Sequence, residues 1–153
     1  KPLAKEKNCD LLFKKPKIRL PKVDIDQGLL RQVIQNLVTN SIRYSEPKLC
    51  DTAVTLEKRD GKDYLVTIKD SGIGIPKEIQ ARIFDKFFRA DNAIKAVVEG
   101  TGLGLYIAKM VIETSGGKIW FESEQEKGTT FYFTIPLSGM KKKGGELGLA
   151  LSP

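Results

Sequence analysis

Two glycine-rich clusters are the residues of this chain best suited to chemistry. The first, Asp70–Pro76 (DSGIGIP), places a carboxylate directly after the strand-like run Tyr64–Lys69 and follows it with two glycines. The second, Gly100–Leu105 (GTGLGL), opens a helix-like run that continues to Thr114. Glycines let a flat ligand approach the backbone closely, and free N–H groups at a helix start suit phosphate oxygens. Together the two clusters predict a nucleotide pocket.

Asp70 is the specific residue of the first cluster. An aspartate that accepts a hydrogen bond from an exocyclic amine can distinguish adenine from guanine, which presents a carbonyl at the corresponding edge. Taken alone, an aspartate after a strand is better explained as a turn residue. The spacing Asp-x-Gly-x-Gly, together with the second cluster, favours the nucleotide interpretation.

Two common phosphate-binding motifs do not fit the second cluster. A dinucleotide fingerprint needs a preceding strand and a third glycine, but Ile107 stands where that glycine belongs. A Walker-type P-loop needs Gly-Lys followed by Ser or Thr, whereas Gly61-Lys62 leads to Asp63 and Gly117-Lys118 leads to Ile119. The remaining alternative for the three glycines is a flexible loop before a helix.

Three polar side chains are candidates for the phosphate end of such a pocket. Asn36 and Asn40 stand one turn apart in a predicted helix, which asparagine does not favour. Asn40 can present its carbonyl oxygen to Mg²⁺, a cation that takes oxygen ligands and shares them with phosphates and water. The alternative is that both amides face solvent or cap a loop. Arg89 suits a terminal phosphate, and a surface salt bridge almost equally well.

Periodicity predicts the elements that position these residues. A helix is expected from about Asp26 to Tyr44, with its apolar face separate from the face that carries Asn36, Asn40 and Arg43. A short helix is expected to begin at Pro76. The other predictions are a helix over Leu103–Thr114, edge strands at Leu11–Phe13 and Ile18–Leu20, and strands at Ala53–Lys58, Asp63–Lys69, Lys118–Ser123 and Thr129–Leu137.

The three phenylalanines after the short helix are expected to be packing residues. Phe84, Phe87 and Phe88 stand at helical spacing, and aromatic side chains in that pattern usually lie in a core or anchor a lid. The segment Ala90–Glu99 has no clear period, which predicts a mobile loop.

Composition limits the possible functions. The 153 residues suit one domain, and the net charge of +7 is scattered without a helical stripe, so no nucleic-acid partner is expected. The absence of histidine excludes a histidine metal site, a histidine-based triad and a phosphohistidine within these residues. The chain starts without methionine, so it is expected to be a fragment of a larger protein.

Cysteine usage and apolar runs indicate the compartment. Cys9 and Cys50 lie 41 positions apart and are too few for a disulfide scaffold, so both are expected to be structural thiols in a reducing cytoplasm. No apolar run approaches the roughly 20 residues that span a bilayer, and no signal peptide is apparent. The domain is therefore expected to be cytoplasmic and to make no membrane contact.

With these motifs in order, the chain resembles the ATP-binding catalytic domain of sensor histidine kinases, in the wider GHKL superfamily. The resemblance runs from about Leu3 to Leu137. Five motifs carry it: Leu30–Tyr44 resembles the N box, Asp70–Pro76 the G1 box, Ile83–Arg89 the F box, Gly100–Leu105 the G2 box and Gly128-Thr129 the G3 position. Arg43 stands where lysine is more usual, and Ser41 where alanine is common.

The resemblance implies the site residues. Asn40 would coordinate Mg²⁺, Asp70 would receive the adenine amino group, and Tyr44 would border the adenine. Asn36, Arg43 and Arg89 would face the phosphates, with Asn36 and Arg89 in catalytic roles. Members of the motifs complete the ATP site: Gly72, Gly74, Ile75, Phe84, Gly100, Thr101, Gly102, Leu103, Gly104, Leu105 and Thr129.

The resemblance also implies a fold and domain boundaries. The fold would be an α/β two-layer sandwich of the Bergerat type, with a mixed sheet covered by helices on one face and a lid over about Arg89–Thr101. Residues 1–8 would be the remnant of a junction to a missing phosphoacceptor domain. Residues 9–137 would form the catalytic domain, and residues 138–153 a flexible tail.

The function implied is transfer of the γ-phosphoryl group of Mg-ATP to a histidine on a separate dimerisation domain, in two-component signalling. A response regulator would be the downstream partner. The full-length protein would be a homodimer with an optional membrane anchor, and the isolated domain a monomer. Two alternatives stay open: an ATPase module of the same superfamily, which carries a glutamate where this chain has Asn36, and a regulatory nucleotide-binding domain without kinase activity.

Overall fold

The structure is a computed structural model that describes residues 2–16, 19–45, 50–59, 61–89 and 101–140. Within these ranges five strands form a sheet in the order β1-β2-β3-β5-β4, with β1 and β2 parallel and the other neighbours antiparallel. The mixed sheet is thus confirmed. The strands are β1 (Asp10–Lys14), β2 (Asp51–Arg59), β3 (Asp63–Asp70), β4 (Ile119–Glu124) and β5 (Gly128–Pro136).

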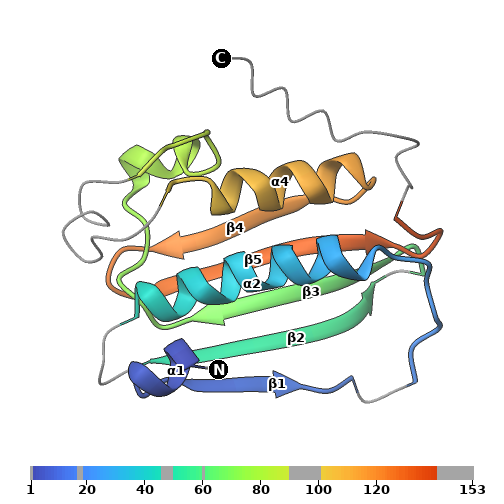
Figure 1. Cartoon of the computed structure of the whole chain (residues 1–153), viewed down its shortest axis with the longest axis horizontal. Helices are drawn as coiled ribbons and strands as arrows, with labels where there is room; N and C mark the ends of the chain where they lie inside the picture. The colour runs from blue at the N-terminus through green and yellow to red at the C-terminus, as the bar shows by residue number, and fades with distance from the viewer. Residues whose placement is uncertain (1, 17–18, 46–49, 60, 90–100, 141–153) are drawn as a thin grey trace.

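Two helices cover one face of this sheet, which confirms the predicted α/β architecture. They are α2 (Gln27–Arg43) and α4 (Gly104–Thr114), and Figure 1 shows them side by side in front of the sheet, running nearly along the strands. A short helix, α1 (Pro2–Glu6), lies beside the C-terminal end of α2, and the 3-10 helix η1 (Lys77–Arg82) follows β3. None of the helices in the described ranges is long and apolar enough to cross a membrane.

The helix α2 has the two faces that its sequence predicts. Asp26 caps its N-terminus, because its Oδ1 accepts a hydrogen bond from the Leu29 N–H at 3.0 Å. Val33 and Leu37 are fully buried against the sheet, and each such side chain stabilises the fold by roughly 1.5–3 kcal/mol. The asparagine face is turned away from this core.

The central strand β3 brings Asp70 to its position. Tyr64, Val66 and Ile68 alternate with more exposed residues and point into the core, where the register pairs Val66 with the fully buried Phe133 of β5. Asp70 continues the same alternation, so its carboxylate is turned to the helical side of the sheet. The strand period therefore places a charged side chain at the edge of the apolar core.

One predicted strand and one predicted core residue are wrong. Arg19 and Leu20 are not in a strand, and Ile18 lies outside the described residues. Phe87 is 63% exposed and has a left-handed φ of 64°, because its N–H donates to the Gly102 carbonyl and turns the side chain away from the core. Its neighbours Phe84 and Phe88 do pack against the core.

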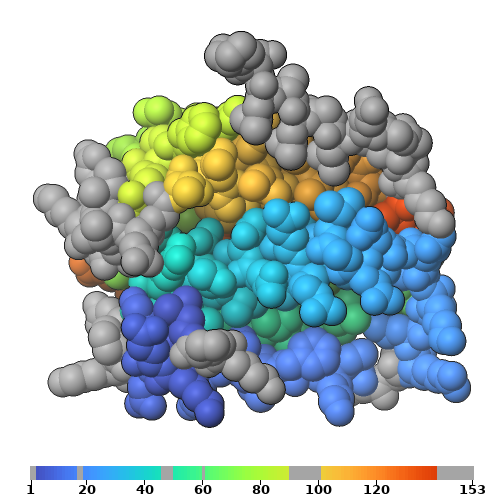
Figure 2. Space-filling model, in the orientation of Figure 1, coloured from blue at the N-terminus to red at the C-terminus, as the bar shows by residue number. Residues whose placement is uncertain are grey.

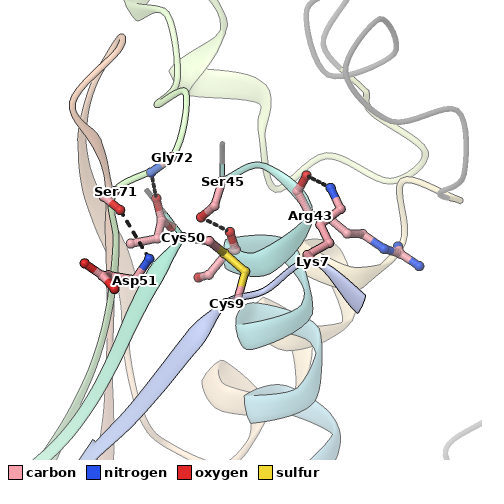
Figure 3. The surroundings of a disulfide bond; sticks show 10 residues. Lys7, Cys9, Arg43, Ser45, Cys50, Asp51, Ser71 and Gly72 are labelled. Atoms are coloured by element: carbon pink, nitrogen blue, oxygen red, sulfur yellow. Dashed lines mark hydrogen bonds between the residues drawn. A yellow bond between two sulfur atoms is a disulfide. The ribbon is translucent and has the colours of Figure 1, made fainter. Parts of the chain in front are cut away.

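The prediction of two free thiols is also wrong, because Cys9 and Cys50 form a disulfide (Figure 3). Each cysteine immediately precedes one of the two parallel strands, β1 and β2, whose register pairs Asp10 with Asp51. This register brings together two residues that are 41 positions apart in the sequence.

The segment expected to be a tail begins with packed residues. Met140 is buried, and its N–H donates to the Asp24 carbonyl at 2.9 Å. Residues 141–153, as well as the predicted mobile loop at 90–99, lie outside the described residues.

Candidate functional site

A cavity of about 890 Å³ lies between α2, the end of β3 and the start of α4. Its volume falls in the range of roughly 300–1,000 Å³ that is typical of small-molecule sites. Most of the residues predicted for the site line it. They are Asn36, Asn40, Arg43, Tyr44, Asp70, Gly74, Ile75, Arg89, Thr101, Gly102, Gly104, Leu105 and Thr129.

Three predicted site residues within the described ranges do not line this cavity: Phe84, Gly72 and Leu103. Phe84 makes edge-to-face ring contacts with Phe121 and Phe131, at centroid distances of 5.9 and 6.5 Å, and so belongs to the core. Gly72 is buried beside Asp70, and Leu103 is the residue preceding α4. Gly100 lies outside the described residues.

One end of the cavity is defined by the Asp70 carboxylate, which is 7% exposed. Its Oδ1 accepts hydrogen bonds from the Gly72 N–H at 3.0 Å and the Thr129 N–H at 2.9 Å. Burial raises the pKa of Asp70 above its ordinary value, and hydrogen bonds from Gly72, Thr129 and Ser41 oppose this shift. A carboxylate offers about four lone-pair sites, so Asp70 can still accept a hydrogen bond from a bound amine.

The first glycine cluster is held against the end of α2. The Ile73 N–H donates to the Tyr44 carbonyl at 2.9 Å, and a Cβ on Gly72 would lie 2.5 Å from that same oxygen. Glycine is therefore required at position 72 by the close approach of the α2 backbone. The residue positions Asp70 and Tyr44 relative to each other, although it does not face the cavity itself.

The N-terminus of α4 forms another part of the cavity wall. Leu103 precedes the helix and provides no side-chain cap, so the first N–H groups of α4 are available to an anion. Asn36 reaches across from α2 and donates from Nδ2 to the Gly104 carbonyl at 3.2 Å. This bond fixes the α4 terminus relative to the asparagine face of α2, on which Asn40 also lies.

Gly102 has a packing role that the sequence did not indicate. Its φ is +69°, and a Cβ there would lie 2.7 Å from the carbonyl carbon of Phe87. The Phe87 N–H donates to the Gly102 carbonyl at 3.1 Å. The second glycine cluster is thus hydrogen-bonded to, and packed closely against, the segment that ends at Arg89, which also lines the cavity.

Sequence reasoning missed the apolar part of the cavity. Its wall includes Leu3 of α1 and Leu11 and Phe13 of β1, which lie far from the glycine clusters in the sequence. Ser41, noted only as a departure from a motif, also lines the cavity, beside Asp70. The remaining unpredicted lining residues are Ile34, Gln35, Val38, Thr39, Ile42, Val54, Ile73, Pro76, Ile79, Ile83, Phe88 and Phe131.

The side-chain oxygens of the cavity suit a metal ion that is bound together with a phosphate ligand. No group of three or more His, Cys, Asp or Glu side chains capable of holding a metal occurs among the described residues. The amide oxygens available at Asn36 and Asn40 are weak, neutral ligands on their own. Mg²⁺ commonly takes one or two protein oxygens and completes its shell with substrate phosphates and water.

The chain is similar to known proteins in both sequence and fold. Residues 25–139 match the family described as histidine kinase-, DNA gyrase B-, and HSP90-like ATPase. The sensor histidine kinase WalK of Bacillus subtilis (strain 168) is 38% identical over 135 residues. The sensor protein SrrB of Staphylococcus aureus (strain NCTC 8325 / PS 47) is 39% identical over 133 residues. These matches cover 88% and 87% of the chain but 22% of each relative's length.

Two solved structures share the fold. The catalytic domain of histidine kinase ThkA, in a nucleotide-free form, superposes with a TM-score of 0.71 at 32% identity, covering 88% of this chain and 84% of that one. Full-length ShkA in complex with AMPPNP superposes with a TM-score of 0.74 at 26% identity. That match covers 92% of this chain and 28% of ShkA.

Proposed function

This chain belongs to the family of histidine kinase-, DNA gyrase B- and HSP90-like ATPases, and from this premise we propose that it binds Mg-ATP and phosphorylates a histidine on another domain. The β–γ bridging bond of ATP breaks, ADP leaves, and a nitrogen of the acceptor histidine forms the new bond to phosphorus. The chain has no histidine, so the acceptor belongs to a separate domain or subunit.

The observation that carries the proposal is that one cavity is lined both by the buried Asp70 carboxylate and by an uncapped helix N-terminus. An amine acceptor and an anion site in the wall of one cavity suit a molecule with a purine amine and phosphates. Tyr44 lines the cavity close to Asp70, where it would border the adenine ring.

The residues at the phosphate end would supply positioning and charge. Asn40 would offer its amide oxygen to Mg²⁺, which when bound neutralises phosphate charge. Arg43 and Arg89 line the same cavity and would face the phosphates as fixed cations. Thr101, Gly102, Gly104 and Leu105 lie at the start of α4, where their backbone would approach the phosphates.

Asn36 favours phosphoryl transfer to a protein over hydrolysis. An amide cannot take a proton from water as a carboxylate can, and Asn36 already donates from Nδ2 to the Gly104 carbonyl. The ATPases of this superfamily that the chain resembles carry a glutamate at this position. The acceptor domain, a response regulator downstream of it, homodimerisation of the full-length protein and a cytoplasmic location are part of the same proposal, which the similarity to WalK and SrrB supports.

The test is transfer of label from [γ-³²P]ATP to a histidine-bearing helical hairpin added in trans. Acid-labile phosphohistidine is expected on the hairpin, and its formation should be reduced strongly by Asp70→Ala. Gln32→Ala is the matched control, because Gln32 is exposed on the same helix α2 and does not line the cavity. Rapid ATP hydrolysis without the hairpin, and no label on it, would assign the chain to the ATPase branch.

A further inference from the structure

The disulfide occupies a defined place next to the candidate site. Cys9 and Cys50 immediately precede the parallel strands β1 and β2, and their Cα atoms are 4.6 Å apart. This separation lies within the range of roughly 4.4–6.8 Å that a disulfide can bridge. The bond joins the segment made of α1 and β1 to the rest of the fold, and it closes a loop that contains all of α2.

The two cysteines differ in their exposure to solvent. Cys50 is 5% exposed and packs with Ala4 and Ile42 in a small cluster separate from the main core. Cys9 is half-buried and lies at the edge of that cluster. A small thiol or disulfide can therefore reach the sulfur of Cys9 more easily than that of Cys50.

Both sides of the disulfide are connected to the candidate nucleotide site (Figure 3). On the Cys9 side, the Lys7 Nζ donates to the Arg43 carbonyl at 3.0 Å, at the C-terminal end of α2. On the Cys50 side, the N–H of the next residue, Asp51, donates to the Ser71 Oγ at 3.4 Å. Ser71 stands between Asp70, which lines the cavity, and Gly72, whose N–H donates to the Asp70 Oδ1.

The tethered segment also forms part of the cavity wall. Leu3 of α1 and Leu11 and Phe13 of β1 line the cavity. In Figure 2, α1 (dark blue) covers the surface beside the C-terminal end of α2 (cyan). β1 is a five-residue edge strand with exposed side chains and pairs with β2 on one side. Without the disulfide, few buried contacts hold this segment in place.

We propose that the Cys9–Cys50 pair is a reversible redox site that controls nucleotide affinity. The inference rests on the proposed function, because an ATP-dependent kinase domain works in the cytoplasm, where glutathione and thioredoxin keep thiols reduced. Cytoplasmic disulfides are usually transient, catalytic or redox-sensing rather than permanent. The disulfide form corresponds to the ordered cavity described above, and the dithiol form loosens α1 and β1.

The chemistry is thiol–disulfide exchange with a low-molecular-weight disulfide such as oxidised glutathione. The Cys9 thiolate attacks one glutathione sulfur, forming a mixed disulfide and releasing one glutathione. The Cys50 thiolate then attacks the Cys9 sulfur and releases the second glutathione. Two protein thiols are oxidised, two electrons pass to the glutathione disulfide, and the two thiol protons leave with the two reduced glutathiones.

The two equilibria must be linked in both directions. If the disulfide form binds nucleotide at least about fivefold more tightly, bound nucleotide must disfavour reduction of the disulfide by the same factor. For this two-electron couple, a fivefold change corresponds to a midpoint potential about 20 mV more negative with nucleotide bound.

The experiment measures both sides of this linkage on the full 153-residue chain. Calorimetry with AMPPNP and Mg²⁺ compares the oxidised protein with the same protein reduced by dithiothreitol. In parallel, the midpoint of the disulfide is measured in glutathione buffers by thiol alkylation and gel shift, with and without AMPPNP. The double variant Cys9→Ser/Cys50→Ala is the control and is expected to bind like the reduced protein, with no response to dithiothreitol.

The expected result is at least about fivefold tighter AMPPNP binding by the oxidised protein, with the matching shift in midpoint. Equal dissociation constants for the two forms, with no midpoint shift, would overturn the redox proposal and leave nucleotide binding intact. Absence of AMPPNP binding by both forms would instead overturn the proposed function, and the redox coupling with it. A dithiothreitol effect that persists in the double variant would also overturn the redox proposal.

Discussion

The Oδ1 of Asp70 accepts a hydrogen bond from the Thr129 N–H at 2.9 Å, joining the ends of two adjacent strands across 59 positions of sequence. This bond holds the buried carboxylate in a fixed orientation at one end of the cavity. A preorganised acceptor loses little conformational freedom when it binds an amine. We therefore expect Asp70 to determine which base the cavity accepts.

Replacing Asp70 with alanine is expected to remove the preference for adenine. The exocyclic amine of ATP would lose its acceptor in a buried site, at a cost of about 1–3 kcal/mol. GTP is expected to bind poorly to the parent protein, and the Asp70→Ala substitution is expected to change the GTP affinity little. Competition of each nucleotide against a fluorescent ATP analogue measures both effects. Equal binding of ATP and GTP by the parent would contradict the role given to Asp70.

Nucleotide affinity is expected to fall as the solution is made acidic. The fall should occur at a higher pH than it would if Asp70 had the pKa of an ordinary aspartate. Burial raises the pKa of Asp70, and only the ionised carboxylate accepts without a competing proton. Nucleotide affinity is therefore present above the pKa that Asp70 has in the folded protein. It is lost as the pH falls through that pKa, toward the ordinary aspartate pKa of about 4. Titrations at several pH values measure the midpoint.

The control for this pH dependence is Asp70→Asn, whose amide does not titrate. The same nucleotide is used for both proteins, so any ionisation of the nucleotide itself affects them equally. The parent is expected to lose more affinity than the variant as the pH is lowered. Parallel curves for the two proteins would show that another group is responsible.

Asn40→Ala is expected to abolish the part of nucleotide affinity that depends on magnesium. Alanine has no oxygen to offer Mg²⁺, whereas the adenine contacts at Asp70 are unchanged. Calorimetry with ADP, with and without Mg²⁺, separates the two contributions. If Mg²⁺ raises the ADP affinity of Asn40→Ala as much as it raises that of the Gln32→Ala control, Asn40 is not a ligand of the metal.

Gly102→Ala is expected to destabilise the fold more than Gly61→Ala. Both glycines have left-handed φ, of +69° and +72°, so both substitutions carry backbone strain of about 1–2 kcal/mol. A Cβ at position 102 would also clash with the Phe87 backbone, whereas a Cβ at position 61 meets nothing within 4 Å. Urea unfolding of the two variants measures the difference. Equal losses of stability would mean that the Phe87 backbone moves away from the new Cβ without a cost in free energy.

Opening the disulfide is expected to lower the free energy of unfolding by about 3–4 kcal/mol, from the loop-closure entropy of a 41-residue separation. The comparison is urea unfolding of the oxidised protein with and without dithiothreitol. The double variant Cys9→Ser/Cys50→Ala should match the reduced protein and should not respond to the reductant. An unchanged unfolding midpoint after complete reduction would show that the α1–β1 segment is held by its other contacts.

The sequence alone was sufficient for the elements whose signals are local. The apolar spacing predicts α2 to within a residue at each end, and the alternation over Asp63–Lys69 predicts β3 and the carboxylate that follows it. Helix period, strand period and glycine clusters are properties of neighbouring residues, so they can be read without knowledge of the fold. The mixed sheet and the helical layer came from the resemblance, and the structure confirms them.

The tertiary structure alone decided the features that depend on distant residues. Cys9 meets Cys50 because β1 and β2 are parallel and in register, and nothing in their spacing indicates this. Phe84 joins the core while Phe87 is exposed, since the Gly102 contact turns the backbone between them. The apolar wall formed by Leu3, Leu11 and Phe13 likewise exists only after α1 packs beside α2 and β1 pairs with β2. Long-range register and packing direction depend on the whole chain, so local patterns cannot specify them.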